Sequence, residues 1–298
     1  MDKVKTMKKK VVGIGEILWD VFPERKVLGG APANFAYHAT QLGLEGYAIS
    51  AIGDDELGRE ILSVLQDKSL KHILEQTPYP SGSVKVTLNG NGIPEYEICE
   101  NVAWDNIPLT AEMKDLAREI DAVCFGTLAQ RNKVSKDTIQ AFVNLLPSHA
   151  LKIYDVNLRQ TFFTEEVITQ SLNLANILKI NEEELVRVSN LLSITMKDEQ
   201  ETCTALMNKF GINIVVLTRG ENGSFVFTKN ETSFLETPKV KVVDTVGAGD
   251  AFTGALVAGL LNGDTILEAH KSAVDVSAFV CTQQGAMPIL PDRLVKPR

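Results

Sequence analysis

A glycine-rich segment, Asp244-Thr245-Val246-Gly247-Ala248-Gly249-Asp250, joins a predicted strand to a predicted helix. Alternating valines at 240, 242 and 243 predict the strand, and small and apolar residues over 251–261 predict the helix. Free backbone N–H groups and the helix dipole favour an anion at such a helix start. Gly247 and Gly249 let the backbone approach that anion closely. The segment therefore predicts an anion site with the carboxylate of Asp250 in the first turn of the helix.

The carboxylate of Asp250 restricts the kind of anion that this site would hold. It would repel a resting phosphate, but it suits a phosphoryl group in transit, where Asp250 takes the proton from the attacking hydroxyl. The same residues also fit a simple strand–turn–helix joint in which Asp250 is an N-cap. The segment alone leaves both interpretations open.

Two segments nearer the N-terminus carry further groups that could bind a ligand. Gly29-Gly30-Ala31-Pro32-Ala33-Asn34 precedes the first long helical pattern, and it combines paired glycines with an amide that donates and accepts hydrogen bonds. Glu16 and Asp20 follow the first apolar run, where carboxylates can accept hydrogen bonds from sugar hydroxyls. A tight turn into a helix and two solvated loop acids are the alternative interpretations.

Polar groups also follow three later apolar runs, at residues 155–159, 179–184 and 218–223. Ligands gather at the carboxyl ends of the strands in parallel sheets. Each segment is a weak signal by itself, but their repeated position predicts one functional rim of a sheet.

Short apolar runs alternate with helical patterns along most of the chain. The runs that predict strands are 11–14, 47–52, 122–125, 152–156, 177–180 and 213–218, and the patterns that predict helices include 33–42, 57–66, 136–146 and 199–209. Continuous apolar strands that alternate with helices are typical of a parallel sheet covered on both faces. The fold class is therefore α/β.

One region departs from this alternation. Residues 83–88 and 94–98 alternate apolar and polar side chains around the turn signal Asn89-Gly90-Asn91-Gly92, which predicts an antiparallel hairpin with one solvated face. Inserted in an α/β chain, such a hairpin could be a lid that excludes water from a phosphoryl-transfer site. An ordinary edge hairpin is the other interpretation.

The composition restricts the class of protein. The chain has 298 residues and a net charge of −8, so we expect neither general binding to nucleic acid nor binding to an anionic membrane. Neither a signal-peptide pattern nor a membrane-spanning run is predicted. The histidines lack metal-ligand spacing. Four scattered cysteines without a C-x-x-C pair suit a reducing, cytoplasmic location; they are Cys99, Cys124, Cys203 and Cys281.

Two common nucleotide motifs are missing. The chain has no G-x-x-x-x-G-K-[ST] sequence, which excludes a Walker-type phosphate loop. Gly13-Ile14-Gly15 lacks the third glycine of G-x-G-x-x-G because Leu18 occupies its place, so a dinucleotide fold is poorly supported.

Over nearly its whole length the chain resembles the ribokinase-like (PfkB) carbohydrate kinases, and among them bacterial fructokinases most. Six motifs in the expected order carry the resemblance: 15–20, 29–36, 52–55 with Gly58, 155–159, Asn181 with Glu184, and 244–252. The family fold is three-layered, with a central mostly parallel sheet between helices and a small β-sheet lid. The resemblance implies one such domain over 1–298, with its lid formed from about 16–28 and 82–100.

By this resemblance, the catalytic machinery lies in the segment around Asp250. Asp250 is the catalytic base, and the backbone N–H groups of Gly247, Ala248 and Gly249 form the anion hole. Asp244 and Val246, with the loop 282–285, resemble a monovalent-cation site.

The resemblance also assigns the binding residues of the two substrates. The sugar-binding positions are Asp20, Gly30 and Asn34, and Arg159 matches a position near the substrate and phosphates. The nucleotide and Mg²⁺ positions are Asn181, Glu184 (reaching Mg²⁺ through water), Thr218, Gly220 and Gly223. Val274 stands where relatives often have an asparagine that holds the nucleotide, which puts the nucleotide's polar contacts in doubt.

The expected reaction is transfer of the γ-phosphoryl of ATP to the primary hydroxyl of a sugar, with fructose as the first choice and Mg²⁺ and K⁺ as cofactors. Another sugar or sugar acid, such as ribose or 2-keto-3-deoxygluconate, is an alternative. A phosphorylated acceptor would need extra cations, for which Arg25 and Lys26 are candidates. A sugar-binding regulator is a further alternative. Relatives often dimerise through their lids, and the strand at 83–88 would permit a homodimer if it is an open edge.

Overall fold

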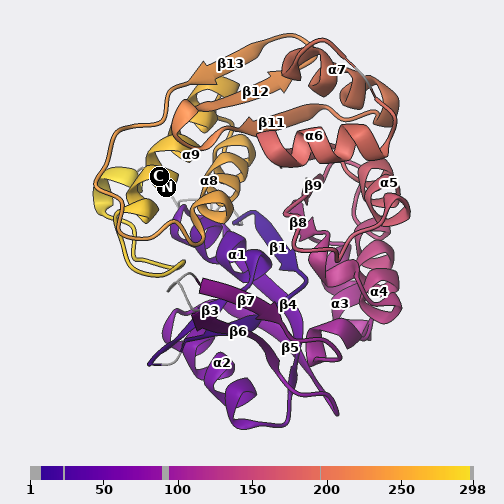
Figure 1. Cartoon of the computed structure of the whole chain (residues 1–298), viewed down its shortest axis with the longest axis vertical. Helices are drawn as coiled ribbons and strands as arrows, with labels where there is room; N and C mark the ends of the chain where they lie inside the picture. The colour runs from indigo at the N-terminus through magenta and orange to yellow at the C-terminus, as the bar shows by residue number, and fades with distance from the viewer. Residues whose placement is uncertain (1–7, 23, 89–93, 195, 296–298) are drawn as a thin grey trace, which may run out of the picture.

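The computed structural model of the chain describes residues 8–22, 24–88, 94–194 and 196–295. Within these residues the centre is a nine-stranded sheet (Figure 1). In order across it, the strands are β13 (Thr232–Leu235), β12 (Ser224–Thr228), β11 (Ile214–Thr218), β10 (Ile177–Asn181), β9 (Leu151–Asp155), β8 (Ala122–Gly126), β1 (Lys10–Ile14), β4 (Glu45–Gly53) and β5 (Lys71–Thr77). The pairs β11–β12 and β12–β13 are antiparallel, and the others are parallel.

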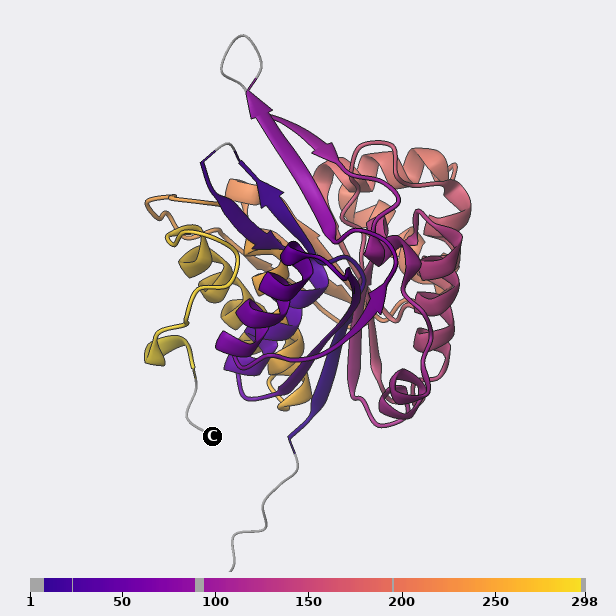
Figure 2. The ribbon, with the colours of Figure 1, turned by 90° about the horizontal axis from the view of Figure 1, so that it is seen from below.

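Helices cover both faces of this sheet. One face carries α1 (Ala31–Gln41), α2 (Glu56–Asp67), α8 (Ala248–Leu261) and α9 (Ile266–Cys281). The other carries α3 (Ala111–Ala117), α4 (Lys133–Asn144), α5 (Glu165–Leu174), α6 (Glu182–Leu191) and α7 (Glu199–Phe210). Figure 2 shows the two helical layers on either side of the strands.

The apolar strands explain this arrangement. Successive side chains of a strand point to opposite faces, so Val11 packs in the core under α1 and α8, while Val12 packs in the core on the other side. Both side chains are completely buried. The expected three-layer α/β architecture is confirmed. In the part of the chain that the structure describes, no helix is long and apolar enough to cross a membrane.

A second, smaller sheet lies beside the first. In order across it, the strands are β3 (Lys26–Gly29), β2 (Leu18–Val21), β6 (Gly82–Leu88) and β7 (Pro94–Ile98). The pair β2–β6 is parallel, and the pairs β2–β3 and β6–β7 are antiparallel. Figure 2 shows it standing out from the main body as two hairpins. The predicted hairpin is confirmed, but its turn signal at 89–92 lies outside the described residues.

Two local predictions are wrong. The strand β6 is not an edge, because β2 and β7 flank it; the edges of the small sheet are β3 and β7. Residues 240–243 form no strand but an exposed loop, in which the Val243 N–H donates to the Cys281 carbonyl at 2.8 Å. This loop follows a sheet that already ends at β13, so the alternating valines have no neighbouring strand there.

Candidate active site

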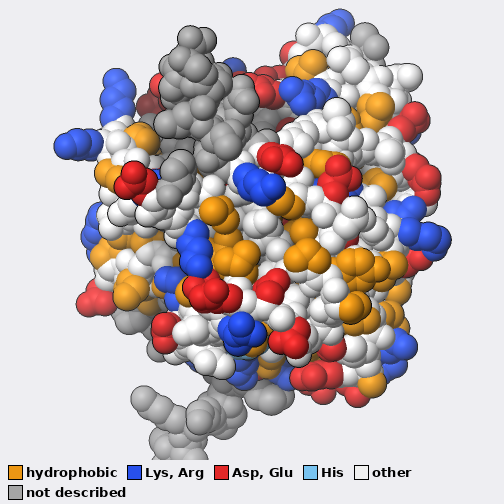
Figure 3. All heavy atoms as spheres, turned by 60° about the horizontal axis from the view of Figure 1, so that its bottom comes forward, with side chains coloured by type: hydrophobic (Ala, Val, Ile, Leu, Met, Phe, Trp, Pro, Cys, Tyr) orange, Lys and Arg blue, Asp and Glu red, His pale blue; other side chains and the backbone are white. Residues whose placement is uncertain are grey.

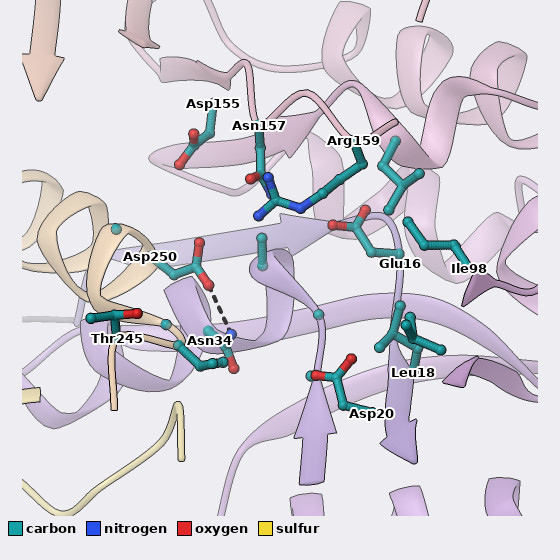
Figure 4. Close-up of a pocket in the computed structure, with 18 of the residues that line it drawn as sticks. Glu16, Leu18, Asp20, Asn34, Ile98, Asp155, Asn157, Arg159, Thr245 and Asp250 are labelled. Carbon is teal, nitrogen blue, oxygen red and sulfur yellow. Dashed lines mark hydrogen bonds between the residues drawn. The ribbon is translucent and has the colours of Figure 1, made fainter. Parts of the chain in front are cut away.

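A cavity of about 600 Å³ lies between the small sheet and the carboxyl ends of the central strands. Leu18 and Asp20 of β2, Val84 of β6 and Ile98 of β7 line it from the small sheet. Polar residues line it from the central sheet and the helices, among them Glu16, Asn34, Asp155, Asn157, Arg159, Lys179 and Asp250. Figure 4 shows the side chains that it labels, among them Asn34, Arg159 and Asp250, converging from segments far apart in the sequence. The polar groups predicted at the ends of several strands therefore share one site, as expected for a parallel sheet.

Asp250 lies in the first turn of α8. Gly247 precedes the helix with φ of 77°, and a Cβ there would lie 2.5 Å from the Cβ of Ala286, so only glycine fits this turn. The N–H groups of a first helical turn have no partner within the helix, and Gly247, Gly249 and Asp250 line the cavity. The glycine-rich turn therefore borders the cavity where the anion site was predicted, and the Ala248 N–H donates to the Thr245 carbonyl at 3.3 Å.

A hydrogen bond aims the Asp250 carboxylate into the cavity. The Asn34 amide nitrogen of α1 donates to its Oδ2 at 2.8 Å (Figure 4). Burial, together with the negative charge of Asp155, raises the pKa of Asp250 to about 6. A carboxylate with a pKa near neutrality that is still ionised at pH 7 suits a general base.

An ion pair lies beside this turn. The Lys179 ammonium of β10 lies 2.8 Å from both carboxylate oxygens of Asp155 at the end of β9. The Thr253 hydroxyl of α8 donates to Asp155 Oδ2 at 3.2 Å. Burial alone would lower the pKa of Lys179, but the charge of Asp155, followed by those of Asp250 and Glu184, raises it, so the ammonium stays charged.

The far side of the cavity carries two more acids and a cation. Glu16 is buried, which raises its pKa to about 7, and its Oε2 has no hydrogen-bond partner among the described residues. Burial also raises the pKa of Asp20, while the positive charge of Arg159 lowers it in part. A Cβ on Gly30 would lie 2.5 Å from the Glu16 carbonyl oxygen, so glycine brings these segments together. This set of hydrogen-bonding groups suits a ligand rich in hydroxyls.

A second cavity, of about 750 Å³, lies on the other side of the first turn of α8. It has apolar walls from Pro238, Val240, Val242, Phe252, Val274 and Ala278, and polar groups from the loop after β11. Thr218, Thr245 and Gly249 line both cavities. The start of α8 therefore separates a polar cavity that holds a carboxylate from a more apolar one, an arrangement that suits group transfer between two substrates.

Residues 14–293 match the family model described as pfkB family carbohydrate kinase. The chain belongs to the pfkB family of carbohydrate kinases. It is 29% identical to fructokinase-2 of Solanum lycopersicum, covering 94% of this chain and 93% of the relative. It is 28% identical to an ATP-dependent 6-phosphofructokinase of Thermoanaerobacterium thermosaccharolyticum, covering 98% and 94%.

Solved structures of the family agree with the fold of this carbohydrate kinase. A fructokinase double mutant from Vibrio cholerae O395, in a form with fructose, ADP and potassium ion bound, superimposes with a TM-score of 0.80 at 26% identity over 96% of this chain and 97% of that one. An aminoimidazole riboside kinase from Salmonella enterica, complexed with aminoimidazole riboside and an ATP analog, also gives 0.80 at 26% identity, over 96% and 98%. The predicted ribokinase-like fold is confirmed.

The residues predicted for Mg²⁺ form a helix cap. Asn181 Oδ1 accepts from the Glu184 N–H at 2.8 Å, and Glu184 Oε2 accepts from the Asn181 N–H at 3.0 Å. Glu184 Oε1 accepts from the Leu158 N–H at 2.9 Å. Both carboxylate oxygens thus already bind backbone, so this pair fits a hydrated Mg²⁺ held through water rather than a directly bound one.

The residues predicted for a monovalent cation form a loop next to the anion site. Asp244 accepts from the Val246 N–H at 3.0 Å and from the Gly285 N–H at 3.2 Å, so it ties the loop before α8 to the loop after α9. Each carboxylate oxygen accepts one backbone N–H and keeps a free lone pair, so both Asp244 and the backbone carbonyls of these loops could supply oxygen ligands for a cation. Such carbonyls suit a weakly hydrated ion such as K⁺.

The structure brings together most of the predicted site residues. Asp20, Gly30, Asn34, Arg159, Asn181, Glu184, Thr218, Val246, Gly247, Gly249 and Asp250 line the first cavity, and Thr218, Gly220, Gly223, Ala248 and Gly249 line the second. Asp244 lines neither and acts through the loops that it joins. Val274 lies in the apolar wall of the second cavity.

Sequence reasoning assigned no role to the pair Lys179–Asp155 or to Thr253. A signal for Lys179 does exist, because it is a lone charge within the apolar run Ile177-Leu178-Lys179-Ile180. A charged residue in a strand buried on both faces needs a partner or a function.

Proposed function

We propose that this carbohydrate kinase transfers the γ-phosphoryl group of ATP to the primary hydroxyl of a sugar, with fructose as the acceptor and fructose 6-phosphate as the product. The observation that carries the proposal is the hydrogen bond from Asn34 that holds Asp250 beside the first turn of α8, where the two cavities meet. A base there can reach a hydroxyl in one cavity while the helix start faces a phosphate entering from the other.

The sugar would bind in the first cavity through Asp20, Gly30 and Asn34. The Asn34 Oδ1 and Glu16 Oε2 are buried without a hydrogen-bond partner among the described residues, and sugar hydroxyls would supply one. Closure of the small sheet over the sugar would exclude water, which otherwise competes as an acceptor.

Asp250 would orient the attacking hydroxyl and accept its proton. The bond from the sugar oxygen to phosphorus forms while the bond from phosphorus to the bridging oxygen of ADP breaks. The N–H groups at the start of α8, which include those of Ala248 and Gly249, would stabilise the charge on the equatorial oxygens.

ATP would lie in the second cavity, its base between Val242 and Val274 and its phosphates toward Gly249. Mg²⁺, held through water near Asn181 and Glu184, would neutralise phosphate charge when bound. K⁺ beside Asp244 and Val246 would support the anion hole; the related fructokinase structure holds potassium.

Fructose is proposed over a phosphorylated acceptor because of where the basic residues lie. Lys26 pairs with Glu60, and Arg25 stacks on the ring of Phe22 at 5.0 Å, so both are engaged outside the cavity. The cavity carries the cations Arg159 and Lys179, but Lys179 is paired with Asp155, and the acids Glu16 and Asp20 lie in the cavity as well and oppose a second phosphate. This argues against fructose 6-phosphate, the acceptor implied by the name of one relative.

The test is ADP release from Mg·ATP with K⁺ present, across fructose, ribose, glucose, 2-keto-3-deoxygluconate, aminoimidazole riboside and fructose 6-phosphate. Turnover on fructose well above the others supports the proposal. Turnover mainly on another sugar would support the mechanism but identify a different acceptor. Sugar binding without any turnover would favour a regulator instead.

Two further parts of the proposal concern the cellular location and the oligomeric state of the enzyme. The four cysteines are free in the structure, which agrees with work in a reducing cytoplasm. Basic, acidic and apolar side chains are interspersed on the face shown in Figure 3.

We also propose a homodimer through the small sheet, whose edges β3 and β7 could pair with a second copy. Light scattering would test it, with a dimer expected for wild type and a monomer for Lys26→Pro, which removes a backbone N–H from the edge strand β3.

A further inference from the structure

Lys179 is held in one position beside the site of phosphoryl transfer. It lies in β10 between buried apolar neighbours, and its side chain is 12% exposed. Its ammonium lies 2.8 Å from each oxygen of Asp155. The Thr253 hydroxyl lies within hydrogen-bond distance of both Asp155 Oδ2, at 3.2 Å, and the Gly249 carbonyl oxygen, at 3.0 Å.

The first turn of α8 leaves space for this ammonium. A Cβ on Gly249 would lie 3.2 Å from Lys179 Nζ, close enough that the ammonium would have to shift by a few tenths of an ångström. Gly249 lines both cavities, and Lys179 lines the first. The missing side chain of Gly249 therefore lets a cation approach the place where the two cavities meet.

The donors of the ammonium are only partly used. A lysine ammonium carries three N–H donors, and the oxygens of Asp155 account for two of them. The negative charge on a transferring phosphoryl group is spread over three equatorial oxygens. The start of a helix carries only about half a positive charge, so it would balance only part of that negative charge.

We propose that Lys179 is a catalytic residue that donates its third N–H to an equatorial oxygen of the phosphoryl group during transfer. The proposal rests on the proposed kinase function and adds a residue to it. Lys179 stays protonated throughout: the proton of the sugar hydroxyl goes to Asp250, and the electron pair of the broken bond goes to the bridging oxygen of ADP.

A purely structural role is the competing explanation, in which Lys179 only neutralises the buried charge of Asp155. The two explanations separate in a D155N background, where the asparagine needs no counter-ion. If Lys179 only neutralises Asp155, adding K179M to D155N will leave the binding of a phosphoryl-group mimic unchanged, and it should raise stability because it removes a buried ammonium that has lost its partner. If it contacts the phosphoryl group, adding K179M will still impair transfer.

The experiment measures binding of ADP with aluminium fluoride, Mg²⁺ and fructose by titration calorimetry, because this combination imitates the transferring phosphoryl group. From D155N to D155N/K179M, we expect affinity to fall about 100-fold, as for loss of one donor to a developing charge. Affinities for ADP alone and for fructose alone should change less than about threefold, and kcat should fall with KM for fructose unchanged. Lys152→Met in the neighbouring strand β9, whose lysine lines neither cavity, is the matched control.

Equal affinity of D155N and D155N/K179M for the aluminium fluoride complex would overturn the proposal. Thermal melting of both variants confirms that they are folded, and Lys179→Arg, which keeps a positive charge, should restore part of the affinity. Failure of the kinase function itself looks different, because wild type would then turn over none of the sugars.

Discussion

Replacing the base is the most direct perturbation of this site, because Asp250→Asn keeps the shape of the side chain but removes its ability to take a proton. A positioned general base contributes roughly 10²- to 10⁴-fold to the rate. At 1.36 kcal/mol per tenfold, this amounts to about 3–5 kcal/mol of the barrier. Sugar affinity should change little, since an amide oxygen at this position can still accept from Asn34, as Asp250 does at 2.8 Å.

The same substitution should stabilise the folded protein. Burial and the neighbouring charge of Asp155 raise the pKa of Asp250 from 3.8 to about 6, so the folded state disfavours the ionised carboxyl. A shift of about two units corresponds to at most about 3 kcal/mol, and water in the cavity screens part of it because the side chain is only partly buried.

The sign of the pH dependence follows from that shift. Between about pH 4 and pH 6 the folded state holds a proton on Asp250 that the unfolded state has lost, so wild-type stability falls as pH rises through this window. The asparagine variant lacks this penalty. Its advantage should be full at pH 7.5 and should disappear below the unfolded pKa of 3.8.

The assay combines ADP release, fructose titration calorimetry and urea unfolding at several pH values between 4 and 7.5. Asp54→Asn, at an exposed acid paired weakly with Arg59 at 3.7 Å, is the control and should change none of these quantities. Near-wild-type turnover of the Asp250 variant would refute its role as the base. A variant less stable than wild type at pH 7.5 would refute the electrostatic reasoning even if turnover is lost.

Three further predictions concern the same site. In wild type, kcat/KM should fall about tenfold per unit below pH 6, because protonated Asp250 cannot act as a base; a flat profile from pH 5 to 7 contradicts this. Asn34→Ala removes a hydrogen bond that lowers the pKa of Asp250, so the acidic limb of the pH profile should move to higher pH, and a shift to lower pH would be inconsistent with it. Gly247→Ala should cost well over 1 kcal/mol in urea unfolding, because positive φ and the 2.5 Å approach to Ala286 act together. Gly211→Ala, at φ of 70° with open space around it, is its control and should cost about 1 kcal/mol.

The fold could be predicted because local patterns and the global architecture agree. Strands such as Lys10–Ile14 are apolar toward both faces, and only a parallel sheet between two helical layers buries them. The site could be located for the same reason, since polar residues at the carboxyl ends of such strands must meet at one rim. Helix caps such as Asn181 with Glu184 are also visible as local sequence patterns.

What the sequence did not reveal depends on contacts between distant segments. The valines at 240, 242 and 243 alternate as in a strand, yet the sheet ends at β13 and leaves them no partner, so two of them line a cavity instead. The sequence placed Lys179 only in a polar segment of the predicted rim, because its proposed role depends on its closeness to Gly249, 70 positions later in the chain. Periodicity describes which way a side chain points, but not which neighbour it meets.

The charges around Asp250 bear on how a carboxylate can lie beside a site proposed to bind an anion. Lys179 carries one positive charge, while Asp155 and Asp250 carry two negative charges beside it, so this trio has a net charge of −1 at pH 7.5. That charge opposes a phosphoryl group before reaction. If Asp250 accepts the sugar proton as proposed, the net charge of the trio becomes zero, and the positive helix start and the ammonium would face the equatorial oxygens without a net opposing charge. In the proposed mechanism, proton transfer to Asp250 would therefore both activate the attacking oxygen and remove the repulsion of the group being transferred, which would explain why an acid can stand in the first turn of a helix that binds an anion.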